Sequence, residues 1–246
     1  MDISIYCNCY KNNTNKRTEY NQKNIMLGAI SYESELKSNL FLKEFIFDDT
    51  GNNISHLNHW FGQLTGLYWT WKNTNEEIIG NSTYRLFWGD YFLKNNFETN
   101  TLYVPESIDI RKCISQNINT ENIYNHYEYC HGPIGLKLLE ELSEKNKIFL
   151  TPKMINNLKE QFTMNSFNMF LSERQIFNKI CSILFEILFI FFSEYKVRYE
   201  LTETFKGQKR ILDFLSERIL HIIYKNLDYF LPGVKLSTIS TIHFNH

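Results

Sequence analysis

The chain has 246 residues, 43% of them hydrophobic and 16% aromatic, which is enough apolar material for a sizeable core. Its 26 basic and 27 acidic residues leave a net charge of −1, which argues against the broad basic surface that general nucleic-acid binding requires. The five cysteines, at positions 7, 9, 113, 130 and 181, lack the paired spacing of a metal site, and they favour a reduced, cytoplasmic protein.

Neither a signal peptide nor a membrane span is predicted. Lys11, Lys16 and Arg17 occur early with no apolar segment beside them, unlike a secretory leader. The apolar run at 180–192 (ICSILFEILFIFF) has 13 residues and contains Glu186, whereas a spanning helix needs about 20 apolar residues. We therefore predict a buried helix there, no transmembrane segment, and a location in the cytoplasm with peripheral membrane contact left open.

Strand and helix signals alternate without repeats, which predicts an α/β fold. In chain order we expect a strand at 3–10, a polar loop at 11–17, a strand at 40–47, an Asp-rich turn at 48–53, a helix at 62–73 and a strand at 77–84. A loop-rich middle extends to about residue 130, and helices at 135–145, 151–161, 173–195 and 206–225 precede a strand-like tail. Four prolines and no low-complexity linker favour one domain over 1–246.

The segment LTGLYWTWKN at 64–73 concentrates aromatic residues on a predicted helix. Four of its residues fall at helical positions i, i+3, i+4 and i+7, namely Leu64, Leu67, Tyr68 and Trp71. Trp69 lies about 150° from the centre of that stripe. We expect the stripe to pack under a sheet and Trp69 to pack against a neighbouring segment.

The predicted helix at 206–225 carries an arginine within its apolar face. Ile211, Leu215 and Ile222 define that face, and Arg218 projects between them. The opposite flank carries three charged residues, Arg210, Asp213 and Glu217. Because a buried arginine is costly unless it is paired, Arg218 either forms a structural pair or contacts a phosphate or a catalytic carboxylate.

Four segments in order resemble one known family: FDDTGNNISHLNHWFGQLTGLYWTWKN, EEIIGNSTYRLFW, FNMFLSERQIF and KRILDFLSERIL. The chain resembles, from about residue 3 to 244, a bacterial capsular and exopolysaccharide glycosyltransferase family that was long catalogued as a domain of unknown function. The resemblance implies a single-domain, GT-A-like α/β fold, with a mixed sheet flanked by helices and long C-terminal helices. It also implies a hexosyltransferase that moves a hexose from a nucleotide sugar, expected to be UDP-linked, onto a glycan acceptor.

The resemblance and the positions of the strand ends suggest the site residues, since ligands of open α/β sheets bind at the carboxyl ends of strands. Donor binding is expected at Tyr10, Lys11, Asp48, Asp49, Thr50, Gly51, Asn53, Tyr84, Arg85, Asn168 and Arg210. Catalysis is expected from Glu217, with Asp213 as the alternative carboxylate and Arg218 beside them, and acceptor binding from Tyr127 and His131. A hairpin turn explains 48–53 equally well, and an aromatic helix docking on the core explains the tyrosine and histidine.

The chain also departs from the family pattern. Thr83-Tyr84-Arg85-Leu86 replaces His-Tyr-Arg-Arg, Tyr10 replaces a histidine, Gln63 an acidic residue and Asp213 a glycine. Losing an imidazole removes an acid, base or metal ligand, so a catalytically impaired nucleotide-sugar or carbohydrate-binding protein is one alternative and a scaffold subunit of a glycan assembly complex is another.

The sequence does not assign a cofactor. A divalent cation such as manganese or magnesium prefers oxygen ligands, but the sequence contains no D-x-D motif. The nearby carboxylates are Asp48, Asp49 and Asp90, while Asp109 stands outside any recognisable strand. Lysine or arginine could neutralise the diphosphate instead.

Overall fold

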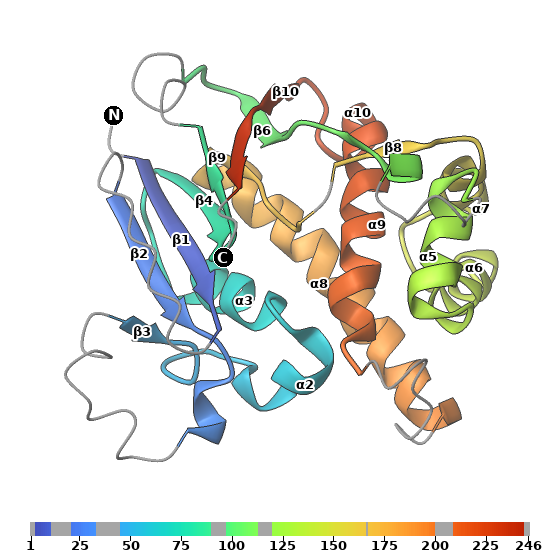
Figure 1. Cartoon of the computed structure of the whole chain (residues 1–246), viewed down its shortest axis with the longest axis horizontal. Helices are drawn as coiled ribbons and strands as arrows, with labels where there is room; N and C mark the ends of the chain where they lie inside the picture. The colour runs from blue at the N-terminus through green and yellow to red at the C-terminus, as the bar shows by residue number, and fades with distance from the viewer. Residues whose placement is uncertain are drawn as a thin grey trace. The chain divides into compact units, whose positions relative to one another are not determined.

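The computed structural model describes residues 3–10, 21–32, 45–89, 97–112, 120–165, 167–199 and 209–243. The chain divides into two compact units. The sheet unit comprises Met1–Glu106, Met169–Cys181 and Gly233–His246, and the helical unit comprises Ser107–Asn168 and Ser182–Pro232. Figure 1 shows the elements of both. The expectation of one domain over 1–246 stays a prediction.

The sheet unit is built on a nine-stranded mixed sheet. Its order is β10-β6-β9-β4-β1-β2-β3, with β5 pairing to both β4 and β11. Strands β1 to β4 are parallel, while β9 runs antiparallel to β4 and β6. The strands are β1 (Ile3–Cys9), β2 (Asn21–Met26), β3 (Phe45–Phe47), β4 (Ile78–Thr83), β5 (Leu86–Trp88), β6 (Thr101–Pro105), β9 (Leu171–Glu173), β10 (Lys235–Ile239) and β11 (Thr241–His243).

Alternation along β1 gives the two faces of the sheet different neighbours. On one face, Cys7 and Cys9 join a core cluster with Met26, Phe45 and Phe87. The other face meets helix α3 (Leu64–Asn73), which lies against β1. Shorter helical segments precede α3, namely η1 (Ala29–Ser31), η3 (Ser55–Leu57) and α2 (Asn58–Phe61), and the first turns of α8 (Arg174–Tyr199) complete the unit.

Helix α9 (Ile211–Lys225) is the central helix of the helical unit. Twelve of its 15 residues are buried. The prediction of a single apolar face was therefore wrong, because a helix with neighbours on most sides buries polar residues as well. The rest of α8 and several shorter elements complete this unit, namely η4 (Ile110–Lys112), α5 (Ile123–His131), α6 (Ile134–Glu144), α7 (Pro152–Asn156), η5 (Asn157–Lys159), α10 (Leu227–Phe230), and the paired strands β7 (Ile108–Asp109) and β8 (Thr163–Met164).

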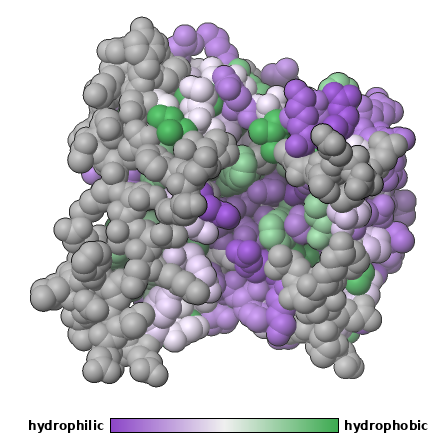
Figure 2. All heavy atoms as spheres, viewed as in Figure 1, coloured by the Kyte–Doolittle hydropathy of each residue, from purple (hydrophilic) through white to green (hydrophobic). Residues whose placement is uncertain are grey.

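Amphipathic patterning explains the outer helices of this unit. On α6, Leu136, Leu139 and Leu142 are buried while Lys137 is exposed. Figure 2 shows mainly hydrophilic side chains on the visible outer surface of α5 to α7. Their apolar sides therefore supply the core of the unit.

The structure confirms the α/β class and most of the strongly patterned elements. The predicted strands at 3–10 and 77–84, the helices at 62–73, 135–145 and 173–195, and the strand-like tail all appear, with small shifts at their ends. The predicted strand at 40–47 is described only from Phe45, and residues 206–208 of the last predicted helix lie outside the described ranges. Helix α9 begins at Ile211.

Other expectations were wrong in part. The supposed loop-rich middle contains β5, β6 and α5, and the predicted helix at 151–161 is only α7 followed by a 3-10 turn that ends at Lys159. Strands β2 and β9 were missed: β2 begins with polar residues (NQKN), and β9 has three residues directly before a helix. Asp109, expected outside a strand, ends β7 and pairs with Arg111, whose hydrogen bonds lower the pKa of the Asp109 carboxyl to about 2.

Helix α8 contains the apolar run at 180–192. Within the described ranges it is the one helix long and apolar enough to cross a membrane, by length and composition only. More than half of the residues in its most apolar window are buried, among them Leu184, Leu188 and Phe191. This burial agrees with the predicted core helix.

Candidate functional site

The carboxyl ends of β1, β2, β3 and β4 lie at one edge of the sheet, because these strands are parallel. From β1 the chain proceeds to β2 and β3 on one side, and it later adds β4 on the other side (Figure 1). The crevice at such a switch point is where ligands of open α/β sheets bind. We call this the carboxyl edge, and it consists of Tyr10, residues 27–28, residues 48–53 and residues 83–85. The sequence predicted that the ends of β1, β3 and β4 would carry site residues, but it did not predict the end of β2, residues 27–28.

Asp48 is a fully buried carboxylate at the end of β3. Its Oδ2 accepts hydrogen bonds from the Gly28 N–H at 2.9 Å and the Thr65 hydroxyl at 2.6 Å. Its Oδ1 accepts from the Ala29 N–H at 2.9 Å and the Ser55 hydroxyl at 2.6 Å. A carboxylate offers about four acceptor positions, and all four are occupied. Asp48 therefore stabilises the turn, and its occupied oxygens leave no position for the predicted donor contact.

The rest of the Asp-rich turn is bound to α3. Trp69 Nε1 donates to both the carbonyl oxygen and the hydroxyl of Thr50, each at 3.0 Å. The Asn73 side chain donates to the Asn52 carbonyl and accepts from the Asn52 N–H. Gly51 has φ +56°, a conformation that favours glycine, and a Cβ there would lie 2.1 Å from Asn73 Oδ1, so a larger residue would displace the Asn73 side chain. These hydrogen bonds attach the turn to α3 at two places.

Two other predicted donor residues in this turn differ in exposure and bonding. Asn53 Nδ2 donates to the Asp49 and Gly51 carbonyls, and Asn53 Oδ1 accepts from the Ser55 N–H. Asp49 is partly exposed, unlike Asp48. Asp49 is thus the carboxylate of the turn that can meet a ligand, and its donor role stays a prediction.

The structure corrects the expected orientation of α3. Leu64 and Leu67 are buried as predicted, but Tyr68 and Trp71 remain partly exposed and Trp69 is buried. Trp69 packs 6.3 Å from the Tyr6 ring, and Gly66 approaches Asn8 so closely that a Cβ would lie 2.2 Å from Asn8 Oδ1. Helix α3 thus turns its Gly66 and Trp69 side to β1. The expectation that Trp69 packs on a neighbouring segment is confirmed.

Tyr10, Tyr84 and Arg85 present side chains at the carboxyl edge. Tyr10 follows β1 and is half exposed. The Tyr84 N–H donates to the Asn8 carbonyl, which fixes the end of β4 beside β1, and the exposed Arg85 guanidinium lies 5.0 Å from the Tyr84 ring centroid. Lys11 lies outside the described residues. Donor binding by these residues stays a prediction.

The helical unit holds Glu217 in a well-defined position on α9. Its Oε1 accepts the Phe167 N–H at 3.0 Å and its Oε2 accepts Arg218 Nη1 at 2.9 Å. The side chain is 16% exposed, so it is reachable, unlike Asp48. Burial raises the pKa of Glu217, while Arg218 and the Phe167 N–H oppose that rise. Such a carboxylate can accept a proton.

Arg218 is a buried cation whose donors bind within the unit. Its Nη1 donates to the Phe214 carbonyl at 3.1 Å as well as to Glu217, and its Nη2 lies 3.0 Å from His126 Nδ1. The residue is 1% exposed. Of the two functional alternatives for Arg218, the geometry favours fixing a carboxylate over contacting a phosphate.

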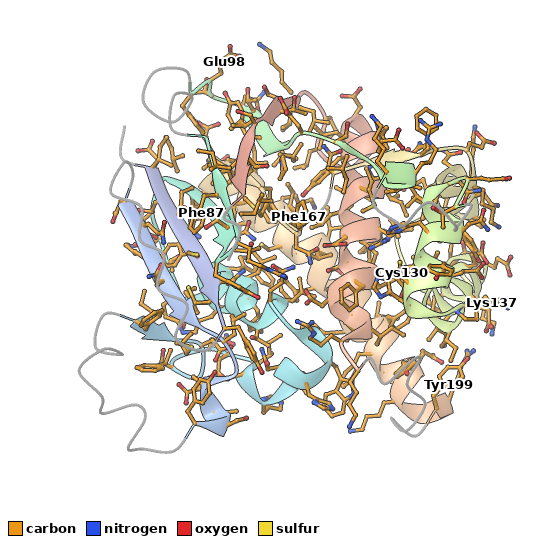
Figure 3. The ribbon with its side chains drawn as sticks, in the orientation of Figure 1. Phe87, Glu98, Cys130, Lys137, Phe167 and Tyr199 are labelled. Carbon is orange, nitrogen blue, oxygen red and sulfur yellow. The ribbon has the colours of Figure 1, made fainter. Side chains whose placement is uncertain are left out.

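A strained turn precedes β9 and reaches Glu217. Phe167 and Asn168 both have positive φ, 74° and 53°, and for a bulky residue this costs about 1 to 3 kcal/mol. Asn168 Nδ2 donates to the Asp213 carbonyl at 3.0 Å, and Asn168 Oδ1 accepts from Ser216 Oγ at 2.7 Å. Asn168 and Asp213 are almost fully buried, so the structure places them in the support of Glu217. In Figure 3, Phe167 marks this turn and Cys130 marks α5.

The remaining predicted residues of the helical unit surround the same helix. Tyr127 is fully buried and packs within the core. Its ring is therefore not exposed for the predicted contact with an acceptor. His131 is partly buried, and its ring centroid lies 3.9 Å from that of Phe214 in a stacked arrangement. Burial, and to a smaller extent the charge of Arg218, lower the pKa of His131 to about 3. Arg210 is 53% exposed, and its Nη1 lies 3.9 Å from Asp213 Oδ2. Its donor role and the acceptor role of His131 stay predictions.

Sequence reasoning missed His126 and the Phe167 N–H. His126 is close in sequence to the singled-out Tyr127, but its partner Arg218 lies 92 residues away. The Phe167 N–H belongs to the backbone, which no residue pattern reveals. The only signal for Phe167 was its place as the first residue of the segment FNMFLSERQIF.

The described residues do not form a recognisable cation site. No three side chains of His, Cys, Asp or Glu come together in the ranges that the structure describes, and the Asp48 oxygens are already occupied. Asp90 lies outside those ranges.

A family model described as "Domain of unknown function (DUF4422)" matches residues 5–227, which is most of the chain. The chain belongs to this family. No curated protein sequence matches it. Membership in DUF4422 agrees with the predicted resemblance to a family catalogued as a domain of unknown function, while the capsular glycosyltransferase activity of that family stays a prediction for this chain.

The DUF4422 chain is also similar in fold to a solved structure described as the apo form of WbbM, a bifunctional glycosyltransferase. The TM-score is 0.72 at 18% identity, and the match covers the whole of this chain. The chain spans 46% of the WbbM chain. At this identity the likeness establishes the mixed α/β fold.

Proposed function

We propose that this DUF4422 protein is a glycosyltransferase that moves a hexose from a nucleotide sugar, UDP-linked, onto a glycan acceptor in polysaccharide or surface-glycan synthesis. The observation that carries the proposal is the likeness in fold, over the whole chain, to part of a bifunctional glycosyltransferase. The carboxyl edge supports it, because a switch point lined by Tyr10, Tyr84 and Arg85 suits a nucleotide sugar.

Glu217 is the proposed base. In the transfer, the acceptor hydroxyl oxygen forms a bond to the anomeric carbon, the bond from that carbon to the diphosphate breaks, and the diphosphate leaves with the electron pair. The hydroxyl proton passes to Glu217. A carboxylate with a pKa raised by burial is a better proton acceptor at neutral pH. The hydrogen bonds from Phe167 and Arg218 hold it in one rotamer.

Arg85 and Asp49 are the proposed donor contacts at the carboxyl edge. Arg85 is exposed and cationic, as a contact to diphosphate requires, and its fork suits phosphate oxygens. Asp49 is partly exposed at the end of β3, where a carboxylate can accept hydrogen bonds from ribose hydroxyls. Asp48 holds the turn in position through its four hydrogen bonds.

The experiment is a panel of UDP-, GDP-, dTDP- and CMP-sugars, read by nucleotide release and by thermal shift. We expect slow hydrolysis of one UDP-hexose and a shift in melting temperature with UDP alone. Lys137→Gln, on the exposed side of α6 (Figure 3), is a control that should behave as wild type. Binding of another nucleotide without UDP binding would overturn the donor assignment. A thermal shift without turnover would identify a binding protein, and neither response would point to the scaffold alternative.

A further inference from the structure

His126 links α5 to the arginine that holds Glu217. Its Nδ1 lies 3.0 Å from Arg218 Nη2, while Arg218 Nη1 bonds Glu217 Oε2 at 2.9 Å. Arginine can only donate, so His126 Nδ1 accepts and the ring proton of the neutral form is on Nε2. The three residues therefore form a chain from imidazole to guanidinium to carboxylate.

The imidazole must be neutral for this contact to exist. A protonated ring would place an N–H and a positive charge against the Arg218 guanidinium. Burial, followed by Arg218, lowers the pKa of His126 to about 4, so the accepting form is present at neutral pH. The other titratable groups near the ring are Cys130, whose Sγ lies 3.9 Å from Nε2, and His131 on the same helix.

Without His126, the orientation of Arg218 is not fully determined. Nη1 has two acceptors, the Phe214 carbonyl and Glu217, whereas Nη2 is bound by His126. Nε has no partner among the described residues and is buried. The Tyr127 ring lies 5.1 Å below the guanidinium but offers no directional bond. Loss of the imidazole would leave Nη2 of a buried cation unpaired in addition to Nε, and rotation of the guanidinium toward other acceptors would follow.

We propose that His126 is a positioning residue: it holds the Arg218 guanidinium in the orientation that fixes the Glu217 carboxylate. Its consequence for catalysis rests on the proposed function, since the fixed carboxylate is the proposed base. His126 itself touches no reacting atom. Its partner is 92 residues away in sequence, on another helix.

The test compares two replacements of His126. In His126→Asn, the amide oxygen takes a position close to that of Nδ1 and can still accept from Arg218. In His126→Leu, a side chain of similar size has no acceptor. His126→Gln, whose oxygen reaches the position of Nε2, replaces the leucine variant if that variant fails to fold. His56→Asn, at an exposed histidine of the sheet unit, is the matched control.

Two readouts are measured on each folded variant. The first is the ¹⁵N NMR spectrum of the Arg218 guanidinium in the ligand-free protein, where restricted rotation gives separate Nη signals. The second is nucleotide release, divided into kcat and KM. We expect His126→Leu to average the Nη signals and to lower kcat about tenfold, with KM for the donor within about twofold of wild type. His126→Asn should restore both to near wild type.

The outcomes separate the two proposals. Unchanged Nη signals and unchanged kcat in His126→Leu would overturn the positioning role, and so would a failure of His126→Asn to rescue in a folded protein. If wild type releases no nucleotide from any sugar, the proposed function fails, and the NMR comparison alone still decides whether His126 holds Arg218.

Discussion

Asp48 and Glu217 are both hydrogen-bonded carboxylates, yet their surroundings give them different capacities. Asp48 is fully buried and accepts four bonds from two backbone N–H groups and two hydroxyls. Glu217 is 16% exposed and accepts one bond from a backbone N–H and one from a buried arginine. A carboxylate with every acceptor position occupied stabilises a fold, whereas one with remaining positions and an exposed edge can take a proton.

The largest expected effect tests the reactive side of this contrast. Glu217→Gln should lower nucleotide release at least 100-fold, about 2.7 kcal/mol, because the amide cannot accept the acceptor proton. Its melting temperature should stay close to wild type, since the amide oxygen can still accept from Phe167 or Arg218. Glu144→Gln, at an exposed position ending α6, is the control. Full activity in Glu217→Gln would remove Glu217 from the chemistry.

Asp48→Asn tests the structural side. The amide nitrogen would face either the Gly28 or the Ala29 N–H, and a buried backbone donor would lose its acceptor. We expect a loss of about 2 to 3 kcal/mol in the free energy of unfolding, measured in urea, with unchanged UDP affinity in the folded fraction. Asp49→Asn should show the opposite: weaker UDP binding and little change in stability. Equal stability of the two variants would remove the distinction.

Arg218→Lys asks how strongly the fork of the arginine matters to Glu217. Lysine keeps the charge but cannot reach Glu217, the Phe214 carbonyl and His126 together in the same planar geometry. We expect turnover to fall at least tenfold, about 1.4 kcal/mol of transition-state stabilisation. Wild-type kinetics in a folded Arg218→Lys protein would make the charge alone sufficient.

The helical unit should also lose stability in acid, through its neutral histidines. Fully buried His221 accepts from the Asn165 N–H at Nδ1 and bonds Gln161 at 2.7 Å, and burial, then Lys225 and Arg218, lowers its pKa to about 3. Below pH 6.5 the unfolded chain therefore binds a proton that the folded chain does not. Stability is complete above about pH 6.5 and falls as the pH is lowered, by about 1 kcal/mol per pH unit for this group.

Urea unfolding of wild type and His221→Gln between pH 7 and pH 5 measures this effect. The variant should show a shallower fall, with the remaining slope due to His126 and His131, whose pKa values are also lowered, to about 4 and 3. An unchanged slope would mean that His221 titrates alike in the folded and unfolded chain.

The smallest effect concerns the attachment of the Asp-rich turn. Trp69→Phe removes the indole N–H that binds the Thr50 carbonyl and hydroxyl while keeping an aromatic ring on Tyr6. We expect a loss of about 1 kcal/mol in stability and little change in turnover. A selective loss of turnover at unchanged stability would place Trp69 in the binding machinery.

The sequence predicted the segments, but it did not predict the burial and the hydrogen bonding of their side chains. Hydrophobic alternation located β1 and β4, and turn chemistry located residues 48–53, so the residues of the carboxyl edge could be named in advance. Whether a carboxylate in that turn is saturated depends on Ser55, Thr65 and the end of β2, which no local pattern brings together. The sequence could not distinguish Asp48 from Asp49 for that reason.

Helix α9 shows the same division. Its periodicity identified a helix with Arg218 on an apolar side and Glu217 beside it, and it raised the question of what pairs with the arginine. The answer lies on α5 and in the turn before β9, through His126 and Phe167. Periodicity also failed to show that α9 is buried almost all round, because burial depends on how many neighbours pack against a helix.

The sequence alone determined the α/β class, the order of most of the main elements and the polar residues at the strand ends, because these follow from local periodicity and turn chemistry. The tertiary structure decided the switch point at β1 and β4, the four bonds that saturate Asp48, and the contacts from His126 and Phe167 that fix Arg218 and Glu217. The physical reason is the range of the interactions. A pattern along the chain reports on neighbours within a few residues, whereas the contact between Glu217 and Phe167 joins residues 50 positions apart and the contact between Arg218 and His126 joins residues 92 positions apart.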